Sequence, residues 1–185
     1  MHESELAPIK KAFFTYRNGI VADTLRQAGD AHQLIFGLVL PQLTLIAKDV
    51  SAQYDNAPEK LSELAQALWE NTTCRESQLL APMIYPQQLY TEDKAQNWVT
   101  QSPNNEVTDV LCMKLLRYLP YAEELAYSLL KDKNTQYAGL RLMVNLLAIG
   151  TISDFSRLTQ AIKTINDSGP LIQLIREYIL DAQQE

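Results

Sequence analysis

The regular spacing of helix-start signals constrains the fold of this chain more than any other feature. Prolines or good capping residues stand at the head of apolar stripes that recur every three to four residues, as in amphipathic helices. Helix pairs are expected to begin at residues 58, 91, 121 and 153, so their starts lie 30–33 residues apart. Such a period is typical of stacked antiparallel helix pairs. The expected pairs are 58–70 with 73–85, 91–101 with 105–119, 121–131 with 134–149, and 153–166 with 170–183.

The composition agrees with a helical fold. Only 6 Gly and 8 Pro occur among 185 residues, and the 46% of hydrophobic residues suffice for a buried core. The apolar stretch "HQLIFGLVL" (32–40) has the length of a strand but no evident partner strand, so we expect a buried connector with at most a stray bridge. We predict an all-α chain that forms one domain over residues 1–185, an α-solenoid of antiparallel helix pairs. An irregular helical bundle is the alternative.

Two local motifs predict how particular helices begin. In "TCRE" (73–76), the Thr73 hydroxyl and the Glu76 carboxylate are spaced for a capping box, which satisfies exposed backbone amides at a helix start. In "NNEVTDVLC" (104–112), Asn105 is a good N-cap residue. Asp109 then lies in the first turn or just beyond it, where a carboxylate is favoured by the helix dipole. The motif therefore leaves two interpretations of Asp109 open, a catalytic carboxylate and an ordinary residue near a helix start.

Charge and motif content exclude several classes of protein. The net charge of −6 and the pI near 5.0 argue against a protein whose main task is non-specific phosphate binding. The cysteines, Cys74 and Cys112, lie in apolar helical patterns and are expected to be buried free thiols, and neither they nor the histidines have the spacing of a metal site. No phosphate-binding loop or nucleophile elbow occurs, so we expect no cofactor and no metal. The first residues lack the apolar centre of a signal peptide and no apolar run reaches ~18 residues, so we expect a cytoplasmic protein that does not enter a membrane.

The order of several weak motifs resembles the DNA alkylation repair family, the bacterial alkylpurine DNA glycosylases built from HEAT-like repeats. In "FGLVLPQLTLIAKDV" (36–50), the matching residues are Phe36, Gly37, Pro41, Ile46, Ala47 and Lys48. In "LAQALWENTTCRESQLLA" (64–81), they are Leu68, Trp69, Glu76, Leu80 and Ala81. The resemblance extends from about residue 13 to residue 150. It implies that the predicted helix pairs are HEAT-like repeats and that a partner, duplex DNA or another protein, lies on their concave face.

The resemblance also implies a site. Active members of the family hold one carboxylate and one arginine in a cleft flanked by tryptophans, and the carboxylate stabilises positive charge that develops on the sugar. Asp109 falls at the carboxylate position, whereas Asn105 replaces the tryptophan one turn earlier. The family's arginine motif falls on residues 137–140, so Arg141 is one residue late and is expected to point away from Asp109. Asp109 is therefore the candidate catalytic residue, and the candidate binding residues are Asn105, Tyr137, Arg141 and Tyr178.

Three functions are compatible with these patterns. The incomplete set of site residues favours a family member that has lost base excision and acts as a binding module for nucleic acid or protein. The first alternative is an active alkylpurine DNA glycosylase that excises cationic alkylated bases through Asp109, with a rebuilt aromatic clamp. The second alternative is a protein-interaction scaffold, which the acidic balance favours.

Overall fold

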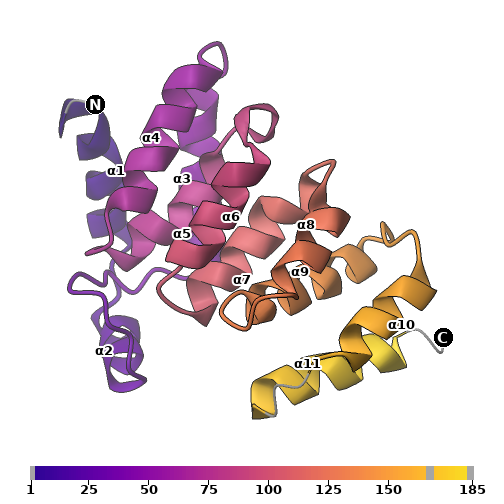
Figure 1. Ribbon diagram of the computed structural model, residues 1–185. Coiled ribbons are helices and arrows are strands. Elements are labelled where there is room, and N and C mark those ends of the chain that lie inside the picture. Colours follow the sequence, from indigo (N-terminus) through magenta and orange to yellow (C-terminus); the bar gives the residue numbers. More distant parts are fainter. Residues whose placement is uncertain (1–2, 166–168, 183–185) are drawn as a thin grey trace. The chain divides into compact units, whose positions relative to one another are not determined.

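The computed structural model describes residues 3–165 and 169–182, and all regular structure in these ranges is helical, as predicted (Figure 1). The one β-bridge among the described residues joins Leu34 to Cys74, in the segment where a stray bridge was expected. The chain divides into two compact units, residues 1–90 and 91–185. The α-helices are α1 (Glu3–Tyr16), α2 (Gly19–Gln27), α3 (Leu40–Gln53), α4 (Pro58–Glu70), α5 (Arg75–Ile84), α6 (Glu92–Gln101), α7 (Asn105–Lys114), α8 (Ala122–Leu129), α9 (Gln136–Ala148), α10 (Phe155–Lys163) and α11 (Pro170–Asp181), and the 3-10 helices are η1 (Gln87–Leu89) and η2 (Leu116–Tyr118).

In the first unit, α5 is the central helix. It packs against both α3 and α4, and α1 packs against α3. Nearly every residue of α5 is buried, including four polar or charged residues at its start. The helix start expected at residue 58 is confirmed, because Pro58 stands in the first turn of α4, and Pro41 stands likewise in the first turn of α3. Trp69 is buried at the end of α4.

The connector before α3 is held by a side chain of α5 rather than by a strand. Glu76 is fully buried, and its two carboxylate oxygens accept hydrogen bonds from the backbone N–H groups of Phe36, Gly37 and Leu38 at 3.0–3.2 Å. Arg75 Nη1 donates to the same carboxylate at 2.8 Å. The predicted capping box at residues 73–76 is therefore wrong. Cys74 is the N-cap of α5, and Glu76 satisfies the amides of a distant segment instead of those of its own helix.

A second polar group lies beside this carboxylate. His32 is buried, with its Nδ1 2.6 Å from Asp30 Oδ1 and its Nε2 2.8 Å from Gln78 Oε1. Gln78 Nε2 donates to the Trp69 carbonyl, which fixes the amide so that its oxygen faces the ring. Both ring nitrogens of His32 thus lie within hydrogen-bond distance of an oxygen atom. Because buried polar groups are stable only when they are hydrogen-bonded, these contacts hold the connector against α5.

Gly37 brings the same connector against α2. Its φ is +78°, and a Cβ at this position would lie 2.2 Å from the Asn18 carbonyl oxygen. Asn18 is the N-cap of α2, and its backbone N–H donates to the Phe36 carbonyl. Ala22 is the only α2 residue buried among those described, and the helix lies below the other helices of this unit in Figure 1. The absence of a side chain at residue 37 is therefore what lets α2 attach to the unit.

In the second unit, the helices form two sets of neighbours. One set is α6 on α8, and in the other both α7 and α11 pack against α9. The two sets are joined where α8 packs on α9, and α10 packs on α11. Gly139 permits the close approach of α8 and α9, because a Cβ there would lie 3.0 Å from the Ala126 carbonyl oxygen. The helix expected over 105–119 is shorter than predicted, since α7 ends at Lys114 and the chain continues as η2.

Candidate functional site

The site predicted around Asp109 lies in the second unit, on α7 and α9. The N-cap of α7 is Asn104, one residue before the expected Asn105, and its side chain accepts a hydrogen bond from the Val107 backbone N–H at 3.0 Å. The prediction that Asn105 caps the helix is therefore wrong. Thr108 stabilises the observed start by donating to the Asn104 carbonyl at 3.0 Å. Two adjacent asparagines are equally good caps by residue type, and the choice depends on this local bonding.

Asp109 is the fifth residue of α7, just beyond the first turn, and its side chain faces α9. Arg141 Nε donates to Asp109 Oδ1 at 2.7 Å, and the Tyr137 hydroxyl donates to the same oxygen at 2.8 Å. The side chains of Asp109 and Arg141 are 34% and 30% exposed, so the pair lies at the surface between the two helices. The prediction that Arg141 points away from Asp109 and forms no ion pair with it is wrong.

The periodicity of α9 explains why Arg141 reaches the carboxylate. Tyr137 and Arg141 are four residues apart, so both side chains lie on the same face of α9. That face contacts α7, because the two helices pack against each other. Asn145, one turn further, donates to the Arg141 carbonyl at 2.7 Å and continues the same polar row. Arg141 therefore reaches Asp109 because it lies on the same helix face as Tyr137, although it is one residue later than the arginine of the family motif.

A buried thiol, Cys112, lies next to the ion pair of Asp109 and Arg141. Cys112 is fully buried, and its thiol contacts the Ala138 carbonyl at 3.6 Å. Burial raises the pKa of Cys112, and the neighbouring Asp109 carboxylate raises it further, so this thiol stays protonated and unreactive. The pKa of Tyr137 is also raised, first by burial and then by the hydrogen bond to Asp109. Tyr137 is therefore a neutral donor to the carboxylate.

The two oxygens of Asp109 differ in their surroundings. Oδ1 accepts both hydrogen bonds, and within residues 3–165 and 169–182 no hydrogen bond to Oδ2 occurs. Similarly, Arg141 uses Nε for the carboxylate, which leaves its terminal Nη groups without a partner in the described part of the chain. The arrangement is a partly exposed carboxylate with one oxygen held by two donors, next to a partly exposed cation. It can stabilise a positive charge near Oδ2 and bind an anion near the guanidinium.

The remaining predicted residues do not join this cluster by hydrogen bonds. Asn105 is exposed on the first turn of α7, one turn before Asp109. Tyr178 lies on α11, which packs against α9, and is 54% exposed. Trp98 is buried in the core of the second unit. The binding roles of Asn105 and Tyr178 stay predictions.

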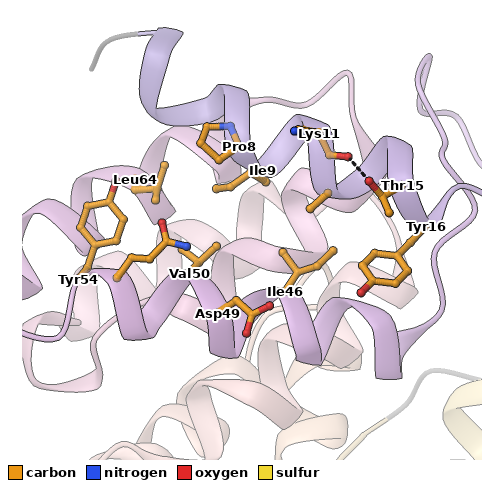
Figure 2. Close-up of a pocket in the computed structure, with 12 residues that line it drawn as sticks. Pro8, Ile9, Lys11, Thr15, Tyr16, Ile46, Asp49, Val50, Tyr54 and Leu64 are labelled. Carbon is orange, nitrogen blue, oxygen red and sulfur yellow. Dashed lines mark hydrogen bonds between the residues drawn. The ribbon is translucent and has the colours of Figure 1, made fainter.

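A separate groove lies in the first unit. It has a volume of about 510 Å³ and lies between parts of α1 and α3. Pro8, Ile9 and Lys11 line one side, and Ile46 and Asp49 line the other (Figure 2). None of the predicted site residues lines this groove. It is therefore unrelated to the chemistry expected of Asp109.

Over the described ranges, no cluster of three or more His, Cys, Asp or Glu side chains is arranged to hold a metal ion. Within the same ranges, every helix is too short or too polar to cross a bilayer.

Comparison with known proteins identifies the family of this chain. A family model described as DNA alkylation repair enzyme matches residues 9–174, which is most of the chain and includes Asp109, Tyr137 and Arg141. No curated protein and no solved structure matches this sequence.

Proposed function

The chain belongs to the DNA alkylation repair enzyme family, and from this premise we propose that it is a DNA glycosylase that excises cationic N-alkylated purines. The observation that carries the proposal is the Asp109 carboxylate, one-third exposed, with Oδ1 held by Arg141 and Tyr137 and Oδ2 directed at no other described group. A carboxylate fixed before the substrate arrives needs no reorganisation during the reaction, which is the condition for effective electrostatic catalysis.

The proposed reaction uses the charge that alkylation places on the base. The bond between sugar C1′ and the base nitrogen breaks, and its electron pair passes to the base, which leaves as a neutral molecule. Positive charge develops on the sugar, where Asp109 Oδ2 stabilises it. Water then adds to C1′ and releases a proton to solvent. Asp109 orients this water through the same oxygen, and Arg141 offers its free Nη groups to a DNA phosphate.

The surrounding architecture supports a surface for DNA. We propose that the helix pairs form a HEAT-like α-solenoid and that duplex DNA lies on the face formed by α7 and α9. The support within the second unit is its pattern of contacts. Here α6 packs on α8, α7 on α9 and α9 on α11, so contacts recur between a helix and the next but one along the chain. In such an arrangement, residues at equivalent positions of α7 and α9 share one surface. The chain's net charge of −6 limits non-specific attraction to that surface.

A second candidate function is a binding module without excision, for nucleic acid or for a protein. The observation that favours it is Asn105, an exposed polar residue where the family carries a tryptophan one turn before the carboxylate. Without an aromatic clamp, the damaged nucleotide loses a stacking partner worth ~1–3 kcal/mol. The acidic balance favours a protein as the partner in this case.

The decisive experiment is release of 7-methylguanine from duplex DNA. We expect measurable release by the wild-type protein and a loss of at least ~100-fold in Asp109→Asn, since loss of one preorganised stabilising group costs about that much. Glu177→Gln, which removes an exposed carboxylate from α11, is the control and should leave release unchanged. Binding of DNA without release would favour the second candidate, and absence of both would leave the protein-interaction scaffold.

A further inference from the structure

Asp109 is bound asymmetrically, and this asymmetry has a specific origin in Tyr137. A carboxylate with one donor can rotate about its Cβ–Cγ bond and exchange its oxygens. Here two donors from one helix face converge on Oδ1, the Tyr137 hydroxyl at 2.8 Å and Arg141 Nε at 2.7 Å. Two convergent bonds restrict rotation of the carboxylate and determine that Oδ2 is the oxygen left for a substrate.

The two donors are not equivalent. Arg141 is a long flexible cation with a partly exposed side chain, and contact with a DNA phosphate would compete for it. Tyr137 has a rigid ring, part of it buried, and a single hydroxyl that is already committed to Asp109. The Cys112 thiol and the Ala138 backbone close the space beneath this pair. Tyr137 is therefore the donor that can hold Asp109 in place while Arg141 moves toward DNA.

We propose that Tyr137 is a positioning residue for the excision reaction, holding Asp109 so that Oδ2 alone faces the sugar. This inference rests on the proposed glycosylase function. It assigns Tyr137 a polar role through its hydroxyl, distinct from stacking on a base. The ring itself serves only to place that hydroxyl.

A kinetic double-mutant cycle tests the role. Tyr137→Phe keeps the ring and removes one hydrogen bond to a charged group, so we expect the single-turnover rate of 7-methylguanine release to fall about tenfold to a hundredfold. The half-saturating DNA concentration should stay within about twofold, because the contact is not with DNA. In the Asp109→Asn background the same change should have no further effect, since Tyr137 acts only through that carboxylate. Tyr118→Phe, an exposed tyrosine of η2, is the matched control.

A spectroscopic measurement tests the contact without DNA. In protein labelled with ¹³C at the tyrosine Cζ atoms, the Tyr137 signal should ionise at higher pH than that of an exposed tyrosine, and Asp109→Asn should lower its midpoint. An unchanged midpoint overturns the proposal, as does a Tyr137→Phe protein with the wild-type rate or an equal loss in both backgrounds. If the wild-type protein releases no base, the proposed function fails together with this role. If release depends on Asp109 but not on Tyr137, only the role of Tyr137 fails.

Discussion

The carboxylate of Glu76 should contribute more to stability than any other single polar side chain of the first unit. It is fully buried and accepts hydrogen bonds from three backbone amides of the connector and from Arg75. Glu76→Gln retains the shape but removes the charge and replaces one oxygen with an NH₂ group. With the amide oxygen toward Gly37, Leu38 and Arg75, the new NH₂ group meets the Phe36 N–H, and two donors face each other.

The magnitude follows from these contacts. An unsatisfied buried donor costs ~1–3 kcal/mol, and removing one partner of a buried ion pair costs ~3–5 kcal/mol. These two costs overlap, because both count the lost carboxylate, so we expect the free energy of unfolding to fall by ~3–5 kcal/mol. Asp30 Oδ2 lies 4.0 Å from Arg75 Nε, which is too far for a direct hydrogen bond that would replace the one from Glu76.

Urea unfolding of the full-length protein, followed by circular dichroism at 222 nm, measures this loss as a lower midpoint. Glu63→Gln, an exposed glutamate on α4, is the matched control and should change the free energy by no more than ~0.5 kcal/mol. A loss below ~1 kcal/mol for Glu76→Gln would refute the argument, since it would mean that the carboxylate is hydrated or that the connector amides find other acceptors.

Three further outcomes are expected. Gly37→Ala should lower the free energy of unfolding by at least ~2 kcal/mol in the same urea assay, because backbone strain at φ +78° adds to a collision with the Asn18 backbone. Gly29→Ala is the control: its φ is +93° but the space around it is open, so it should show the cost of the strain alone. The free energy of unfolding should fall as pH rises above about 10. Burial raises the folded-state pKa of Tyr121 and Tyr127 to about 12 and also raises that of Tyr137, whereas the unfolded chain loses these protons near pH 10. Urea midpoints between pH 8 and 11.5 measure this fall, and a constant midpoint would contradict it. Undamaged duplex DNA should bind with a Kd at or above ~10⁻⁶ M at physiological salt, and nanomolar binding in a fluorescence titration would show a basic surface that the net charge conceals.

The helix starts marked by a proline were the most predictable part of the fold. Pro41, Pro58 and Pro170 each stand in the first turn of a helix, as their residue type predicts, and Thr91 is the N-cap of α6. These signals act within one helical turn, so they can be recognised in the sequence. The connector at 32–40 was also predicted, because no partner strand existed for it.

The candidate site was predictable in its residues but not in its geometry. Asp109, Tyr137 and Arg141 were identified from the resemblance, yet the ion pair was predicted to be absent because the arginine was compared with the family motif instead of with Tyr137. Which face of α9 meets α7 is decided by packing, which no local signal specifies. Glu76 was misassigned for a related reason, since its partners lie about 40 residues away along the chain.

The separation between Glu76 and its amides also has a consequence for how the first unit folds. The α4–α5 hairpin forms between sequence neighbours, whereas the bond from Phe36 N–H to Glu76 closes a loop of 40 residues, and long loops are entropically costly to close early. The connector should therefore dock after α4 and α5 have paired, on the native side of the folding barrier. On this reasoning, Glu76→Gln accelerates unfolding and leaves the refolding rate almost unchanged. Hydrogen exchange at the amides of residues 36–38 should then measure how often the connector separates from Glu76, because these amides exchange only when the carboxylate releases them.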